Sequence, residues 1–330
     1  GEKLLQLTKA RFGVFASNGT LALYLGLRAM DIGPGDEVLV SDFTFIASAT
    51  SREMVGARPV LVDVNRDNFQ IDLSGADKLV TPKTKAIMPV HIYGTIADMN
   101  AVMAFAKKHN LLVIEDAAQA IGVYRDGKHA GTFGTVGTFS FFADKTITTG
   151  EGGFVVTDDE NIYEHMLYLR NHGRKERGSC IHPEIGYNFF MTDIQNAVGL
   201  VQLQKLEEIK KRKSHILHLY RELLADIPGI TFFKPDEGAD WVPFRVGILL
   251  DRASELMNCL KEHEIEPRAF FYPLHRQPAL ARFCQNNDTD FPNTVFGYEH
   301  GICLPAFPTL TDKQVRYVCD TIKKFCSEKL

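Results

Sequence analysis

The stretch LLVIEDAAQA, residues 111–120, decides the fold, because an apolar run passes directly into the polar side chains of Asp116 and Gln119. Similar short apolar runs recur before and after it, and helical patterns such as ADMNAVMAFAKKHN (97–110) separate several of them. Apolar strands that alternate with helices are typical of a mainly parallel sheet covered on both faces. The runs are EVLVS (37–41), RPVLVDV (58–64), KAIMPV (85–90), LLVIEDA (111–117), VGTFSFF (136–142) and GGFVVT (152–157).

A long helical pattern occupies the middle of the chain. It begins near Thr192, continues through the charged stretch at 202–224 and ends before Pro228-Gly229, after which a further apolar segment, WVPFRVGILL, follows at 241–250. Such a pattern is typical of a helical connector between two domains. We therefore expect an α/β protein with a large domain at residues 1–212 and a smaller α+β domain at residues 213–330.

Composition and charge exclude several classes of binding partner. The 330 residues carry 37 Lys+Arg against 41 Asp+Glu, a net charge of −4, so we expect no nucleic acid partner. No apolar stretch approaches the roughly 20 residues that cross a bilayer, so we expect no membrane span. Neither CxxC pairs nor metal-type spacing of Cys or His occurs, which predicts no metal site and free thiols in a reducing, cytoplasmic compartment. The cysteines are Cys180, Cys259, Cys284, Cys303, Cys319 and Cys326.

Two strand ends carry candidate catalytic groups. Asp116 follows one strand, and Ser140 and Lys145 flank the end of another, in TFSFFADKTITTGEGG; ligands of open α/β sheets bind at this edge. A partly desolvated lysine can form a Schiff base with an aldehyde, and a carboxylate that faces a pyridine nitrogen keeps that nitrogen protonated. Such groups in a loop are more often solvated surface side chains, so the pattern alone makes Lys145 and Asp116 candidates.

A turn near the N-terminus offers a candidate anion site. Ser17-Asn18-Gly19-Thr20 precedes a helical pattern, so backbone N–H groups and a hydroxyl meet at a helix N-terminus. The same turn could be merely a helix cap. The chain contains neither GxGxxG after a first strand nor GxxxxGK[ST], so no fingerprint of a nicotinamide-dinucleotide or P-loop site is present.

Seven ordered blocks of sequence resemble those of one family, the DegT/DnrJ/EryC1/StrS group of pyridoxal-phosphate sugar aminotransferases, within the fold type I (aspartate aminotransferase) superfamily. The resemblance implies a large domain with a mainly parallel seven-stranded sheet flanked by helices, followed by a smaller α+β domain. The blocks are ASNGTLAL (16–23), SDFTFIAS (41–48), PVHIYG (89–94), IEDAAQAIG (114–122), GTFSFFADKTITTGEGG (137–153), GYNFFMTDIQNAVG (186–199) and FFYPLH (270–275).

The resemblance also implies a role for each matching residue. Lys145 matches the lysine that binds pyridoxal 5′-phosphate (PLP) covalently, Asp116 the acid at its pyridine nitrogen, and Gln119 the residue beside its phenolic oxygen. Phe45 matches an aromatic ring over the cofactor, although a core phenylalanine is an equally ordinary interpretation. The residues that match phosphate binders are Gly19, Thr20 and Ser140.

A further matching residue implies an assembly. Asn188 corresponds to an asparagine that reaches the cofactor phosphate from the neighbouring subunit, so the resemblance implies an obligatory homodimer with a shared active site. Two positions depart from the family pattern. Phe190 stands where an arginine is frequent, and Asp144 precedes Lys145 where a small polar residue is common.

The wording KTITTGEGG (145–153) resembles perosamine-synthase-type members, which aminate a nucleotide-linked 4-keto-6-deoxyhexose, and also the enzyme that makes 8-amino-3,8-dideoxy-octulosonate from an 8-oxo sugar without a nucleotide. Both acceptors stay open. We place His275 and Arg268 near the sugar. We expect an aminotransferase of surface-polysaccharide amino-sugar biosynthesis, which takes the amino group from L-glutamate through pyridoxamine phosphate. Alternatives are a PLP-dependent sugar dehydratase, disfavoured because relatives of that kind replace the lysine with histidine, and a non-catalytic PLP-binding regulator.

Overall fold

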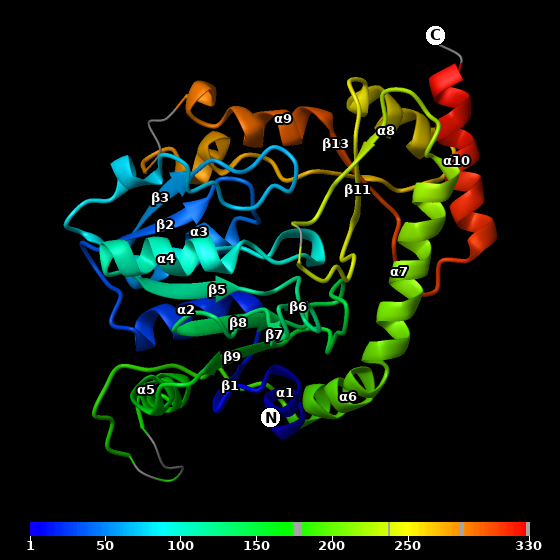
Figure 1. Cartoon of the computed structure of the whole chain (residues 1–330). Helices are drawn as coiled ribbons and strands as arrows, with labels where there is room; N and C mark the ends of the chain where they lie inside the picture. The colour runs from blue at the N-terminus through cyan, green and yellow to red at the C-terminus, as the bar shows by residue number, and fades with distance from the viewer. Residues whose placement is uncertain (175–177, 179, 237, 284–286, 328–330) are drawn as a thin grey trace.

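The central element is a seven-stranded sheet, as expected, with the strand order β1-β9-β8-β5-β4-β2-β3 (Figure 1). The computed structural model describes residues 1–174, 178, 180–236, 238–283 and 287–327; Cys284 lies outside these ranges. The five strands from β8 to β3 are parallel, whereas β9 runs antiparallel to β8 and to β1. The strands are β1 (Phe12–Ala16), β2 (Glu37–Ser41), β3 (Arg58–Val62), β4 (Thr84–Met88), β5 (Leu112–Asp116), β8 (Val136–Ser140) and β9 (Gly153–Thr157).

Five of the six predicted apolar runs contain a whole strand and the sixth, 85–90, contains all of β4 except Thr84, but the edge strand β1 was not predicted. Gly13 interrupts its apolar pattern. A β-carbon at Gly13 would lie 2.3 Å from the ring of Phe154 on the neighbouring strand, so the close packing of β1 on β9 requires glycine there. Gly13 thus allows β1 to pack on β9, and the same glycine breaks the apolar pattern from which the strand could have been predicted.

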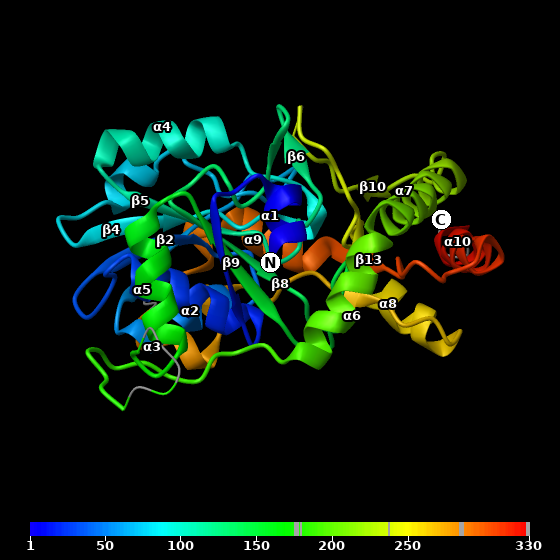
Figure 2. The same ribbon diagram turned by 90° about the horizontal axis from the view of Figure 1, so that it is seen from below.

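Helices cover both faces of the sheet, and Figure 2 shows it between α4 on one side and α2, α3 and α5 on the other. Their buried side chains form two apolar clusters, one on each face. The first face carries α2 (Gly19–Ala29), α3 (Ala47–Val55) and α5 (Glu160–Arg170), and the second carries α1 (Glu2–Thr8) and α4 (Met99–His109). Short elements lie between them: η1 (Ala76–Leu79), η2 (Ile92–Gly94), β6 (Tyr124–Arg125) and β7 (Lys128–His129).

The predicted connector helix consists of two consecutive helices, α6 (Asp193–Gln204) and α7 (Leu206–Leu223), that meet at Lys205. Thr192 and Gln195 form a capping box that fixes the start of α6. Beyond α7, a four-stranded antiparallel sheet of order β10-β11-β13-β12 packs with helices. The elements are β10 (Thr231–Phe232), β11 (Val246–Leu249), α8 (Ala253–Glu262), β12 (Arg268–Ala269), η3 (Leu274–Arg276), η4 (Pro278–Leu280), η5 (Asp288–Asp290), α9 (Pro292–His300), β13 (Gly301–Leu304) and α10 (Asp312–Ser327).

A third apolar cluster begins at Ile216 on α7 and joins this second sheet to α8 and α10 (Figure 1). Its start lies close to the predicted domain boundary at 212/213, which stays a prediction because other side chains after that boundary, among them Phe233 and Phe270, pack into the core of the large sheet. None of the helices in the described part of the chain combines the length and the apolar character that a bilayer crossing needs.

Candidate active site

The strand order places the candidate site at the carboxyl edge of the large sheet. The chain goes from β2 to β3 on one side of β2 and then returns to β4 on its other side. Ligands of open α/β sheets bind where the order reverses in this way. Because β2, β4, β5 and β8 are parallel, the segments that follow them meet at this one edge.

Asp116 is the last residue of β5, and its side chain is oriented by two hydrogen bonds. One carboxylate oxygen, Oδ2, accepts from Ser48 Oγ at 2.7 Å, and the other, Oδ1, accepts from the backbone N–H of Ala118 at 3.2 Å. Ser48 lies on α3, and its hydroxyl also contacts that of Thr44 at 3.1 Å. Asp116 is 5% exposed, so a buried carboxylate is held in one direction at the edge of the sheet.

The neighbouring Glu115 has a separate, structural set of partners. Its carboxylate accepts three backbone N–H groups from the loop 131–134 and lies 2.9 Å from His91 Nε2. His91 Nδ1 accepts from the N–H of Ala97, so the ring proton sits on Nε2 and is donated to Glu115. Glu115 therefore holds the loop 131–134 in place. Asp116 is the carboxylate of β5 that is available to a ligand at the candidate site.

Gln119 is also oriented at this edge. Its amide oxygen accepts from the backbone N–H of Tyr93 at 2.8 Å, which assigns the orientation of the amide and makes its NH2 the group for a ligand. Tyr93 has a φ of 53°, a left-handed conformation that is uncommon outside glycine. The backbone N–H of Tyr93, in the segment after β4, thus holds the side chain of Gln119, in the segment after β5.

Gly19 and Ser140 meet at the N-terminus of α2. A β-carbon on Gly19 would lie 2.8 Å from Cβ and 3.0 Å from Oγ of Ser140, so the glycine leaves open the space beside that hydroxyl. Asn18 caps the helix, because its side chain accepts from the N–H of Leu21 at 2.9 Å. The free N–H groups of the first turn, the hydroxyl of Ser140 and the adjacent Thr20 form a cradle suited to a phosphate.

Lys145 lies in the segment after β8, half-buried, with Nζ 4.7 Å from the centre of the Phe244 ring. Burial lowers the pKa of Lys145, and Arg245 lowers it further, whereas Asp144 and Asp116 act in the opposite direction. An amine whose charged form is disfavoured is a better nucleophile and proton acceptor at neutral pH. The influence of Asp116 on Lys145 means that these two groups lie in one electrostatic environment.

Two cations near Lys145 come from the C-terminal part of the chain and were not predicted. Arg245 Nη2 donates to Asp144 Oδ2 at 2.6 Å. Lys213 on α7 is buried, its Nζ donates to the backbone oxygens of Pro243 and Ala306, and burial lowers its pKa to about 8. Charged residues in a helix or beside a strand give no sign in the sequence that they are buried.

Phe45 and Asn188 are both accessible to solvent in the single chain. The side chain of Phe45 is 60% exposed, so it is not a core phenylalanine. Asn188 is exposed as well; its recorded partners among the described residues are Asn171, by a strand-like bridge, and the N–H of Phe190. Their predicted roles, like those of the other site residues, stay predictions.

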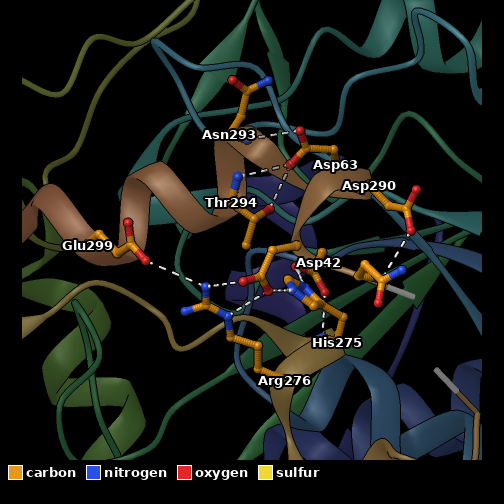
Figure 3. Close-up of polar contacts among 10 residues, drawn as sticks. Asp42, Asp63, His275, Arg276, Asp290, Asn293, Thr294 and Glu299 are labelled. Carbon is orange, nitrogen blue, oxygen red and sulfur yellow. Dashed lines mark hydrogen bonds and ion pairs between the residues drawn. The ribbon is translucent and has the colours of Figure 1, made fainter. Parts of the chain in front are cut away.

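His275, expected near a sugar, has both ring nitrogens next to carboxylates, and Figure 3 shows it beside one of them, Asp42. Nδ1 lies 2.6 Å from Asp42 Oδ2 and Nε2 lies 2.9 Å from Asp288 Oδ1. Burial opposes protonation of the ring, but the hydrogen bonds and charges of Asp42 and Asp288 outweigh it and raise the pKa of His275. Arg276 makes a bidentate pair with Asp288, and Arg268 lies exposed on β12.

The same region contains a second large-domain carboxylate, Asp63, that holds α9. It accepts the backbone N–H groups of Asn293 and Thr294 and the Thr294 hydroxyl (Figure 3). Together, Asp42 and Asp63 fasten the C-terminal segment to the ends of β2 and β3. His275 therefore joins the C-terminal segment to the end of β2 through Asp42. Its contact with a sugar stays a prediction.

The assembled groups fit pyridoxal phosphate. A carboxylate suited to a protonated ring nitrogen, an amide NH2, a phosphate cradle that a β-carbon would fill and a lysine with a lowered pKa all lie at one edge of the sheet. This set was found from the sequence, whereas the residues that support it, Ser48 and Tyr93, were not.

Comparisons with known proteins agree with this geometry. The model of the DegT/DnrJ/EryC1/StrS aminotransferase family matches residues 1–323. GDP-perosamine synthase of Escherichia coli O157:H7 is 39% identical over 99% of this chain and 89% of its own length. UDP-N-acetyl-3-dehydro-alpha-D-glucosamine 3-aminotransferase of Acidithiobacillus ferrooxidans is 37% identical over 96% of this chain and 85% of its own. The crystal structure of S. venezuelae DesV in complex with a ketimine intermediate superposes with a TM-score of 0.94 at 33% identity, over 98% of this chain and 87% of that one.

Proposed function

The chain belongs to the DegT/DnrJ/EryC1/StrS aminotransferase family, and from that premise we propose that Lys145 binds PLP covalently and that L-glutamate supplies the amino group. It is a PLP-dependent sugar aminotransferase of polysaccharide biosynthesis. The observation that carries the proposal is the position of Asp116: Ser48 fixes its carboxylate at the carboxyl edge of the sheet, at the end of β5, and β5 pairs with β8, the strand that Lys145 follows.

Each part of the cofactor has a matching group. Asp116, oriented by Ser48, would face the pyridine nitrogen, and the NH2 of Gln119 would donate to the phenolic oxygen. The phosphate would occupy the cradle of Gly19, Thr20 and Ser140. The supporting fact is that a β-carbon at Gly19 would fill this cradle.

Lys145 has the properties of the group that moves the proton. When bound, PLP supplies an electron sink for the electron pair that remains when an α-proton leaves the donor. Lys145 Nζ accepts that proton as general base and returns it as general acid, and in the second half of the reaction it does so in the reverse order. Its lowered pKa makes the uncharged amine more available for the first of these steps.

The assembly we propose is a homodimer with a shared site. The 12-residue helix α6 has no buried residue in the single chain, and its exposed side chains include Ile194, Val198 and Val201, with Ile194 80% exposed. An apolar helix face of this kind is typical of an interface. Asn188 precedes α6 in the same exposed segment, where it is available to a partner's phosphate cradle, and Phe45 is exposed in its own site.

The acceptor we propose is a nucleotide-linked keto sugar, and first a 4-keto-6-deoxyhexose. Two relatives of similar identity are named for GDP- and UDP-linked sugars, which supports a nucleotide over the free 8-oxo octulosonate. The two relatives are named for different nucleotides and different sugars. The side chains around the sugar therefore determine which nucleotide-linked keto sugar is the acceptor.

The test is the visible absorption spectrum of the purified, PLP-loaded protein before and after L-glutamate is added. We expect a band of bound cofactor that converts to the pyridoxamine form, and 2-oxoglutarate in the solution. Keto sugars linked to GDP or UDP are then added to the converted protein, and mass spectrometry identifies the aminated product. A protein that stays colourless with added PLP would contradict the covalent role of Lys145, and a sugar product without nitrogen would indicate the dehydratase reaction instead.

A further inference from the structure

A buried arginine lies behind the candidate pyridine-binding carboxylate. Arg52 on α3 is 0% exposed and is among the largest fully buried side chains. Its Nη2 donates to the backbone oxygen of Ser48 and lies 3.5 Å from Met88 Sδ on β4. Within the described residues, Nε and Nη1 are buried and have no hydrogen-bond partner. Such an arrangement is costly for a guanidinium, since each unmet donor loses the hydrogen bonds it makes in water.

In the part of the chain that the structure describes, the charge that acts on Arg52 is that of Asp116. Burial lowers the pKa of Arg52 to about 9, and the charge of Asp116 acts against that shift. Arg52 therefore remains a cation at neutral pH. A buried cation is tolerated when a buried anion compensates it, and Asp116 is the carboxylate in this position.

Ser48 connects the two charges. It lies one helical turn before Arg52, so both side chains are on the same face of α3. Its backbone oxygen accepts from Arg52, and its hydroxyl donates to Asp116 Oδ2 at 2.7 Å. A displacement of the Arg52 guanidinium or of the Asp116 carboxylate therefore affects the other group through Ser48.

We propose that Arg52 is a positioning residue whose fixed charge, acting on Asp116 across Ser48, keeps that carboxylate ionised and so keeps the shared proton on the pyridine nitrogen. The inference rests on the proposed role of Asp116. A buried carboxylate without a nearby cation gains a proton more easily. It would then lose its ion pair with the ring nitrogen, and the ring would become a poorer electron sink.

The other charged groups that face Asp116 do not replace Arg52. Lys145 acts on Asp116 from the segment after β8, but its charge changes as it takes up and returns a proton. His91 on the β4 side donates to Glu115, and this pair is satisfied by its own loop. Among the described residues named here, Arg52 is thus the one whose positive charge acts on this carboxylate and takes no part in the proton transfer.

The experiment compares the holoenzyme with Arg52→Met, which removes the charge, and Arg52→Lys, which keeps it. The readouts are the visible spectrum of the bound cofactor as a function of pH and the rate of its conversion by L-glutamate. We expect the acid limb of both profiles to move to higher pH by at least about one unit in Arg52→Met. Arg52→Lys should stay close to the wild type. An acid limb that does not move in Arg52→Met would overturn the inference.

The double variant Arg52→Met/Asp116→Asn separates a charge effect from packing. Without the carboxylate there is no charge for Arg52 to hold, so Arg52→Met should not shift the profile further in the Asp116→Asn background. A shift of equal size there overturns the inference. If Arg52→Met alone does not fold, we expect the double variant to fold, because both buried charges are gone. If neither variant folds, Arg52 has a packing role, and the inference is overturned.

These outcomes are distinct from a failure of the proposed function. If the wild-type protein binds no PLP, the proposed function is wrong and no profile exists. If the wild type shows the cofactor band and converts it, and Arg52→Met titrates as the wild type does, only the role of Arg52 is wrong.

Discussion

A β-carbon on Gly19 would lie 2.8 Å from Cβ of Ser140, so the N-terminus of α2 and the end of β8 approach each other as closely as a glycine permits. We predict that Gly19→Ala weakens PLP binding by at least about tenfold, which corresponds to about 1.4 kcal/mol. The methyl group would fill the cradle and push Ser140 aside. Titration of the apoprotein with PLP measures the change.

Gly33→Ala is the matched control for this substitution. The nearest atom to a β-carbon at Gly33 is 3.9 Å away, so the methyl group meets no obstacle there. Its PLP affinity should equal that of the wild type. An unchanged affinity in Gly19→Ala would show that the phosphate binds elsewhere.

Lys145→Ala should abolish turnover and leave the cofactor bound without a covalent link. We expect a decrease of at least about 10²-fold to 10⁴-fold, since general acid–base catalysis contributes that much. The cradle and Asp116 remain, so PLP should still co-purify or bind on titration. Mass spectrometry after borohydride reduction distinguishes the covalent wild type from the variant. Near-normal turnover in Lys145→Ala would refute its role.

The ion pair of Asp144 and Arg245 should modify the pKa of Lys145, which burial lowers. Because Asp144 raises that pKa and Arg245 lowers it, Asp144→Asn should lower it and Arg245→Met should raise it. The pH dependence of the rate of covalent PLP attachment to the apoprotein measures both. Shifts in the same direction for the two variants would contradict this assignment.

His275→Gln should cost more stability near and below about pH 6.5 than at alkaline pH. The pKa of His275 in the folded protein is raised, so its stabilisation is complete below about 6.5 and is lost as the pH rises through the folded-state pKa. We expect the free energy of unfolding to fall by about 1–3 kcal/mol at about pH 7 and by less at about pH 9, measured by urea denaturation.

Arg276→Gln is the control for that pH dependence. Arg276 binds the same exposed carboxylate, Asp288, but its charge does not titrate in this range. Its effect should be below about 1 kcal/mol and constant with pH. A constant difference for His275→Gln as well would show that the ring is neutral in the folded protein.

The apolar face of α6 should be required for dimerisation. Ile194→Glu combined with Val198→Glu places two charges on that face, so we expect a monomer by light scattering and a decrease in PLP affinity through loss of the partner's Asn188. Met103→Glu on α4, a partly exposed apolar side chain elsewhere, is the control and should remain dimeric. A wild-type monomer that is fully active would contradict the shared site.

Much of the fold was predictable because buried parallel strands leave continuous apolar runs, as in EVLVS at β2 and LLVIED at β5. The division of the long helix at Lys205 was not, since neither glycine nor proline marks it. Asp116 and Ser140 were found because they end strands. Arg52 was missed because an arginine in the helix SATSREMV reads as a solvent-facing side chain; only the tertiary packing shows that it is buried.

The close approach of Gly19 to Ser140 also couples the cofactor to the folding of the chain. The two residues lie far apart in the sequence and meet only where α2 packs on β8, so the cradle does not exist in an unfolded chain. A ligand that binds the native state alone shifts the folding equilibrium towards that state, by about 2.7 kcal/mol at a concentration one hundred times its Kd. Heat or denaturant resistance should therefore rise with added PLP, and the supply of the vitamin from which PLP is made would influence how much of this protein persists in a cell.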